Sequence, residues 1–215
     1  MVMNMKDFSN YHNVNPNEKL THDGLSILEE SLSGFAGYDV TINETVQSRI
    51  LLYEKWDSNS ETKKVIGRIE DIEQGNLFKI GDLNWLVVTF PEDNKIYRKA
   101  ELRLCNSTFL LEIDKTKELK GKDSLGRPVY EEVLVTKNEP CIVETNYYMN
   151  NRNEQITLPS DSVMITLKYQ KALNLDINKE FDLYNSRFRI TFVDYSKVIL
   201  DKGVMTITGE RVMNK

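Results

Sequence analysis

The feature that most constrains this chain is a hairpin pattern that occurs twice, 103 positions apart. In "LFKIGDLNWLVV", residues 77–88, apolar side chains fall in phase on both sides of a Gly-Asp turn, as in two antiparallel strands with one buried face. The apolar phase of residues 78–104 returns without a gap in residues 181–207, which predicts two similar β-modules. The matching positions are Phe78 and Phe181, Ile80 and Leu183, Trp85 and Phe188, Val87 and Ile190, Ile96 and Ile199, Lys99 and Lys202, Ala100 and Gly203, Leu102 and Met205, and Leu104 and Ile207.

The repeat also predicts the role of the tryptophan in the hairpin. Trp85 matches Phe188, and an aromatic residue that exchanges for another aromatic at an equivalent position is usually part of a core. We therefore interpret Trp85 as structural rather than as the centre of a ligand site. Gly81 is expected to supply a positive φ in the adjoining turn.

From about residue 40 onward the chain consists of short β-branched or aromatic runs separated by Gly, Asn, Asp or Pro. The clearest alternation, residues 99–104, places Ala100, Leu102 and Leu104 on one face and charged residues on the other, as in a half-buried antiparallel strand. The predicted fold class is mainly β. It comprises two small antiparallel β-barrel or β-sandwich modules with one short N-terminal helix and extended arms.

The N-terminal residues differ from the rest in having no β pattern. Residues 1–20 are polar and aperiodic, which predicts an irregular arm. Residues 21–38 carry the helix signal, with Asp23 as a candidate cap and a stop signal in "SGFAG". The residues on the apolar stripe of this expected helix are Leu25, Leu28 and Leu32.

A charged segment, "KTKELKGKDSLGRPVY" at 115–130, separates the two modules and is interpreted as an exposed loop or extended arm. The predicted organisation assigns residues 1–38 to the N-terminal arm and helix, 39–114 to the first β-module, 115–130 to the loop or arm, and 131–215 to the second β-module. Segments 1–20 and 115–130 are candidates for docking elements that become ordered only on binding.

Composition narrows the possible function. The 215 residues carry a formal net charge of −5, which argues against a nucleic-acid-binding surface, because phosphate contacts need clustered Lys and Arg. No apolar run approaches the roughly 18–20 residues that span a bilayer. The start of the sequence lacks the apolar core of a signal peptide, so we expect a protein that is made in the cytosol and does not enter a membrane.

Residues that could bind a metal or act as nucleophiles are few. Cys105 and Cys141 are the only cysteines, and in a cytosolic product they are expected to be free, half-buried thiols. His12 and His22 have no cysteine or glutamate at zinc-binding spacing around them, so no metal site is expected.

The usual enzymatic motifs are also missing from the sequence. There is no G-x-S-x-G, and "LKGKDS" at 119–124 fails as a P-loop because Thr116 replaces the first glycine and Asp123 follows the lysine. The acidic clusters are interpreted as solvated strand ends, and we predict no catalytic, cofactor-binding or metal-binding residues and no enzymatic activity. The members of these clusters are Glu70, Asp71 and Glu73, and Glu131 and Glu132.

Several motifs between about residue 65 and residue 212 resemble those of a family of virion proteins. These motifs are "GNLFKIGDLNWLVV", "IYRKAELRLCN" followed by "FLLEI", "CIVET", "ITLPSDSVMITL", "RFRITFVDYSKV" and "KGVMTITGERV". The chain resembles head-closure, head–tail connector or neck proteins of tailed bacteriophages. At Phe109 and Leu110, just after "CN", the sequence departs from the tryptophan associated with the family.

The resemblance implies a virion structural protein, made in the bacterial host cytoplasm, that forms a ring in the neck, joins the portal side to the tail side and closes the filled head. The implied partners are other copies of the chain, a portal or adaptor protein, and a tail terminator or tail tube protein. A position lining the DNA channel is compatible with this role and requires no sequence-specific nucleic-acid binding. The alternative is another tail or baseplate module that contacts the tail or the host surface.

Overall fold

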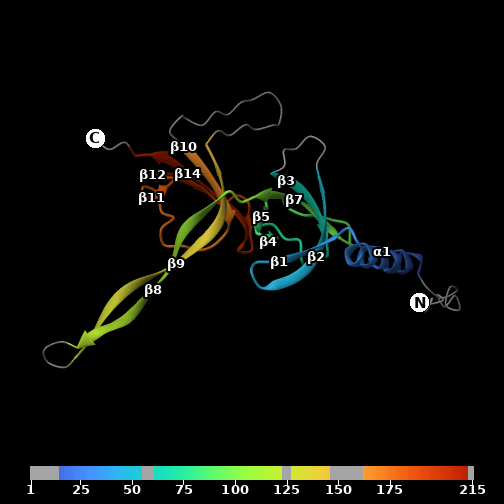
Figure 1. Ribbon diagram of the computed structural model, residues 1–215, viewed down its shortest axis with the longest axis horizontal. Coiled ribbons are helices and arrows are strands. Elements are labelled where there is room, and N and C mark those ends of the chain that lie inside the picture. The colour runs from blue at the N-terminus through green and yellow to red at the C-terminus, as the bar shows by residue number, and fades with distance from the viewer. Residues whose placement is uncertain (1–14, 55–60, 123–126, 146–161, 213–215) are drawn as a thin grey trace.

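The computed structural model describes residues 15–54, 61–122, 127–145 and 162–212, and these form one helix and two antiparallel β-sheets. Figure 1 shows the two sheets side by side, with helix α1 beside the first and a long two-stranded hairpin projecting from the second. The prediction of a mainly β fold with two modules is confirmed. The structure specifies it as a closed six-stranded barrel followed by a half-barrel.

The first module is a closed barrel because the strands at the two ends of its six-stranded order pair with each other. The sheet order is β3-β2-β1-β4-β5-β7, and a further pairing of β3 with β7 completes the circle. Closure leaves no edge of these six strands free for pairing with other chains. The strands are β1 (Gly37–Ile42), β2 (Val46–Glu54), β3 (Thr62–Gly67), β4 (Leu77–Ile80), β5 (Leu83–Val87), β6 (Glu92–Asp93), which pairs only with β7, and β7 (Arg98–Leu104).

The second module repeats this strand order but stays open. Its sheet runs β8-β9-β10-β14-β12-β11, which corresponds strand for strand to β1-β2-β3-β7-β5-β4, so the repeat predicted from the sequence is confirmed in the topology. The rings of Phe109 and Phe181 meet edge to face at 5.2 Å across the opening between β8 and β11. The strands are β8 (Ser107–Lys122), β9 (Pro128–Glu144), β10 (Ser162–Lys168), β11 (Glu180–Leu183), β12 (Ser186–Asp194), β13 (Val198–Ile199), which pairs with β14, and β14 (Lys202–Arg211).

Trp85 lies in the core of the barrel, as its exchange with Phe188 predicts. Its side chain is 4% exposed, and its cross-strand neighbour on β4 is Phe78. The equivalent pair in the half-barrel, Phe181 and Phe188, is stacked at 5.8 Å. Gly81, in the turn between β4 and β5, has a φ of +60°, so the predicted positive φ is also confirmed.

The helix begins earlier than expected. α1 spans Pro16–Ser33, and the side chain of Asn15 caps it by accepting a hydrogen bond from the backbone N–H of Asn17 at 3.0 Å. The prediction that residues 16–20 are irregular and that Asp23 caps the helix is therefore wrong, and residues 1–14 lie outside the described residues.

Two of the three leucines of the predicted stripe face the barrel. Leu28 and Leu32 are buried, whereas Leu25 is exposed. The Ile96 side chain also packs against the helix at Gly24, where a Cβ atom would stand 2.5 Å from the Ile96 Cδ1 atom. The chain then turns at Gly34 and enters β1 at Gly37.

A small third core joins the modules. Leu77 and Leu86 of the barrel pack against Ile142 and Val204 of the half-barrel. Beside them the backbone of Gly75 lies so close to that of Gly203 that a Cβ atom on Gly75 would stand 2.1 Å from the Gly203 carbonyl oxygen. Glycine at position 75, with a φ of +87°, is therefore what allows the two modules to pack this closely.

Candidate functional site

The outer part of the β8–β9 hairpin has no structural role within the two modules. We call it the arm and define it as residues 113–135. Strands β8 and β9 pair continuously from Ser107 and Cys141 to Lys122 and Pro128, and Figure 1 shows the arm leaving the half-barrel and extending away from both modules. The sequence predicted a loop or arm at 115–130. The loop alternative is wrong for residues 115–122 and 128–130, which are strand, while 123–126 lie outside the described residues.

The arm is anchored where it leaves the sheet. The backbone N–H of Glu112 donates to the Asn174 side-chain oxygen at 3.1 Å, and the Leu173 N–H donates to the Glu112 carbonyl at 2.6 Å. Immediately beyond this anchor the strand has a bulge at Ile113, where the register with β9 shifts. A bulge adds a bend and extra twist to its strand, so this one sets the direction in which the arm projects.

Apolar side chains are exposed on both faces of the arm. Cross-strand partners point to the same face, so Leu119 and Tyr130 share one face and lie 60% and 59% exposed. Leu134 belongs to that face and is also exposed, whereas the other face carries the exposed Val129, Val133 and Val135. An isolated two-stranded ribbon is only marginally stable in water, so exposed apolar residues on both of its faces indicate a partner that covers them.

The charges of the arm are solvated. Lys120 pairs with Glu131 at 2.6 Å, and both side chains are more than half exposed, so the pair contributes little stability. For Glu131 the interpretation as a solvated acidic residue agrees with the structure.

The junction between the modules holds the base of the arm in place. Arg103 of β7 pairs with Glu144 at the end of β9 at 2.7 Å. Asn106 accepts a hydrogen bond from the Val143 N–H at 2.8 Å and donates one to the Val143 carbonyl at 3.0 Å. These contacts connect the root of the hairpin to the barrel, so the arm is attached where the two modules meet.

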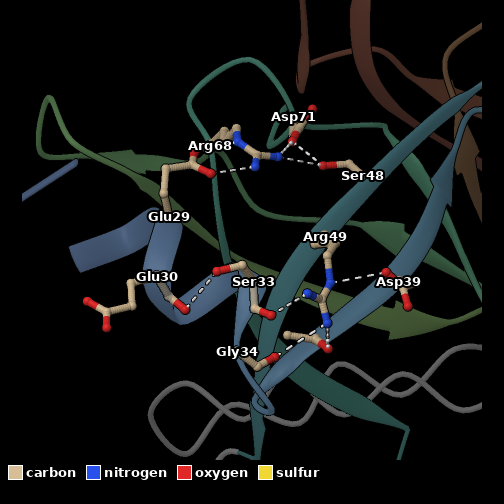
Figure 2. A network of polar contacts seen from close by, with 10 residues as sticks. Glu29, Glu30, Ser33, Gly34, Asp39, Ser48, Arg49, Arg68 and Asp71 are labelled. Atoms are coloured by element: carbon tan, nitrogen blue, oxygen red, sulfur yellow. Dashed lines mark hydrogen bonds and ion pairs between the residues drawn. The ribbon is translucent and has the colours of Figure 1, made fainter. Parts of the chain in front are cut away.

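A network of polar contacts lies between α1 and the barrel (Figure 2). Arg68 makes a two-pronged contact with the carboxylate of Glu29 on α1, with both nitrogen–oxygen distances at 2.7 Å. This hydrogen-bonded pair lowers the pKa of Glu29 and raises that of Arg68. Arg68 also faces Asp71 at 3.7 Å, and Asp71 accepts a hydrogen bond from the Ser48 hydroxyl.

Asp71 is buried rather than solvated, which corrects the interpretation of its acidic cluster. A second arginine secures the end of the helix in the same view, because Arg49 donates to the Ser33 carbonyl at 2.8 Å and pairs with Asp39 at 3.1 Å (Figure 2). Both arginines have partners within the protein, so we assign this network to docking the helix and not to ligand binding.

The two cysteines are free thiols in buried surroundings, as expected from the sequence. Burial raises the pKa of Cys105 to about 12 and that of Cys141 to about 12, so neither sulfur is a thiolate at neutral pH. The nearby Glu139 is fully buried, and the Lys137 ammonium lies 2.8 Å from its carboxylate. This ion pair raises the pKa of Lys137.

Of the two histidines considered as metal ligands, the structure describes His22. His22 is exposed on α1 and lies 3.8 Å from Asp23, while His12 lies outside the described residues. In the described part of the chain, no three His, Cys, Asp or Glu side chains are grouped so that they could hold a metal ion. The single described helix is not long and apolar enough to cross a membrane.

Comparison with known proteins divides the chain where the two modules meet. The YomX N-terminal domain family matches residues 10–104 and the YomX C-terminal domain family matches residues 107–210. The "SPbeta prophage-derived uncharacterized protein YomX" of Bacillus subtilis strain 168 is 34% identical over 211 residues, which cover 96% of this chain and 97% of that protein. No solved structure matches the chain. The boundary between the matched domains falls between β7 and β8, which is also the boundary between the barrel and the half-barrel.

Proposed function

The chain belongs to the YomX family, and on that premise we propose that it is a bacteriophage virion protein that forms a ring in the neck. In this role it joins the portal side of the head to the tail side and closes the filled head. Two findings support the proposal: its relative is prophage-derived by name, and the sequence motifs resemble those of neck proteins.

The observation that carries the proposal is the arm. A two-module body bearing a projecting hairpin with apolar faces is suited to contacts between neighbouring subunits, because the projection reaches beyond its own module. Between Asp114 and Lys122 the strand covers about 26 Å at roughly 3.3 Å per residue. This distance is comparable with the diameter of a 100-residue module, about 33 Å when estimated from a radius of gyration near 13 Å.

The proposed partners are other copies of the chain, a portal or adaptor protein, and a tail terminator or tail tube protein. We propose no catalytic role, since the thiols are protonated and the two arginines of the polar network have partners within the protein. The acidic net charge of −5 fits a component near the DNA channel, because a negative wall does not retain the passing DNA. The negative net charge also favours a protein that stays soluble and mostly monomeric at micromolar concentration, before the part of the particle to which it binds has assembled.

The test is deletion of the gene from the phage that carries it, followed by electron microscopy of the lysate. The expected result is free tails together with heads that are unjoined and leak DNA, and wild-type protein supplied from a plasmid should restore joined particles. Joined particles with closed heads that fail to attach to cells would contradict the neck role and would favour the tail or baseplate alternative. Normal infectious particles would contradict any essential virion role.

A further inference from the structure

A groove with a volume of about 300 Å³ lies at the junction of the two modules. The barrel contributes Phe90 and Pro91, and the half-barrel contributes Ile199 and Leu200. Phe90, Ile199 and Leu200 are all more than half exposed. The groove therefore presents apolar side chains from both modules to solvent.

The charged residues of this groove are already paired with each other. Lys202 of β14 contacts Glu73 of the barrel at 2.7 Å, and Arg98 contacts Asp93 at 2.9 Å. A charged ligand would have to compete with these pairs, whereas an apolar side chain would not disturb them. The groove thus favours an apolar occupant.

Leu200 is the least expected residue of the groove. It lies in the two-residue turn between β13 and β14, where Leu200 and Asp201 both have positive φ, at +49° and +59°. Such turns favour Asn-Gly, and a leucine in the left-handed region is energetically unfavourable. Leu200 is also 92% exposed, so it gains nothing from burial within its own chain. A contact with another chain would account for a leucine at this position.

The arm carries a surface that complements the groove. Its face with Leu119, Tyr130 and Leu134 has the largest exposed apolar side chains of the hairpin. Because the two strands of the arm are paired along their length and point away from the body (Figure 1), the arm does not turn back into its own groove. The arm and the groove are two different apolar surfaces on one chain, and contacts between unlike surfaces generate head-to-tail rings when the rotation closes.

We propose that the arm face formed by Leu119, Tyr130 and Leu134 docks in the groove around Phe90, Ile199 and Leu200 of a second copy of this chain. This inference rests on the proposed function, since it takes the working state to be a ring of copies. With three apolar side chains from each copy, we expect the contact to bury less than the roughly 1,200 Å² of a stable interface. Association of the free protein is therefore weak and becomes effective only when a platform holds the copies together.

The first test is sedimentation equilibrium of purified protein with Leu200→Gly and a matched control. Wild type should be monomeric at micromolar concentration and associate reversibly as the concentration approaches about 1 mM, the scale of a weak contact. Leu200→Gly removes the apolar side chain and relieves the strain of a leucine at positive φ, so association should weaken about tenfold or more while thermal stability rises.

Tyr184→Gly is the control. Tyr184 also has a positive φ, +48°, in the two-residue turn between β11 and β12, and it does not line the groove. This control should gain stability without losing association.

The second test mixes two defective chains. Leu119→Ser combined with Tyr130→Ser damages the arm and leaves the groove, whereas Leu200→Gly damages the groove and leaves the arm. Each variant alone should be monomeric, and an equimolar mixture should form dimers but nothing larger, because one intact arm and one intact groove remain per pair.

Three results would each overturn the proposal: wild type that stays monomeric near 1 mM, variants that associate as wild type does, or a mixture that stays monomeric. These results concern the purified protein, so they are independent of whether the gene deletion places the protein in the neck.

Discussion

Replacing Trp85 by alanine tests whether the barrel depends on this residue as its central core side chain. The indole is 4% exposed, lies opposite Phe78 on β4 and Leu104 on β7, and has the Lys63 ammonium 5.5 Å from its ring centroid. The six strands around it form a closed circle, so they cannot move inward freely to fill the space that the ring leaves. The variant should therefore retain a cavity in the barrel.

The magnitude follows from the buried area. A tryptophan buries about 200 Å², and at about 25 cal/mol per Å² its removal from the core costs about 5 kcal/mol. Aromatic-to-alanine substitutions in other cores cost about 3–5 kcal/mol, and that range is our expectation for the free energy of unfolding. For a chain of this size each kcal/mol corresponds to about 2–4 °C, so the melting temperature should fall by about 6–20 °C.

The assay is urea and thermal unfolding followed by circular dichroism, because the substitution removes a fluorescent residue. Phe35→Ala is the matched control, since Phe35 is a fully exposed aromatic side chain and its loss should leave stability unchanged. Phe188→Ala, at the equivalent buried position of the half-barrel, should cost a similar amount. A Trp85→Ala protein that keeps wild-type stability and loses only the ability to assemble would refute the reasoning and identify Trp85 as a contact residue.

Three further substitutions test the turns, the module junction and the helix contact. Gly81→Val should cost about 1–3 kcal/mol in the free energy of unfolding, measured in urea, because valine is strained at the φ of +60°. Gly75→Ala should cost more than Gly81→Ala, since only the former brings a Cβ atom against the Gly203 carbonyl; equal losses would mean that the modules shift apart easily. Glu29→Gln should lower the melting temperature at pH 7. The hydrogen bond from Arg68 lowers the pKa of Glu29, so this contribution is present above the ordinary value of 4.5 and disappears as pH falls below it, and a pH-independent difference would contradict the assignment.

Much of the β architecture could be predicted from the sequence, because alternation and turn residues act locally. The in-phase hairpin around Gly81 and the strand with Ala100 and Leu102 were recognisable from these signals alone. The return of the apolar phase 103 residues later predicts a repeated module, and the repeat extends to the order of the strands. The first module is closed because β1 pairs with β4, whereas the equivalent strands of the second module, β8 and β11, do not pair. This long-range difference has no local signature in the sequence.

Two of the errors have local causes, and the third has a long-range cause. The capping signal of Asn15 and Pro16 is hard to recognise because it lies within a polar, Asn-rich stretch. The arm was interpreted as a possible loop because "KTKELKGK" has no apolar alternation, although Val129, Val133 and Val135 on the facing strand follow a strand-like pattern. The burial of Asp71 could not be predicted, since it depends on contacts with Ser48 and Arg68 that only the folded barrel creates.

The most direct measurement of the central claim is the fraction of heads joined to tails in a phage whose protein lacks the arm. Replacing residues 113–135 with an Asn-Gly turn leaves Glu112 paired with Thr136 and closes the hairpin at the anchor. The purified variant should keep a β-type circular dichroism spectrum, weakened only by the loss of the deleted strand residues, and nearly wild-type melting, because the deleted side chains are largely exposed. Electron microscopy of the lysate should then show separate heads and tails. Joined, infectious particles at the wild-type frequency would show that the arm is not the assembly element and would contradict the account.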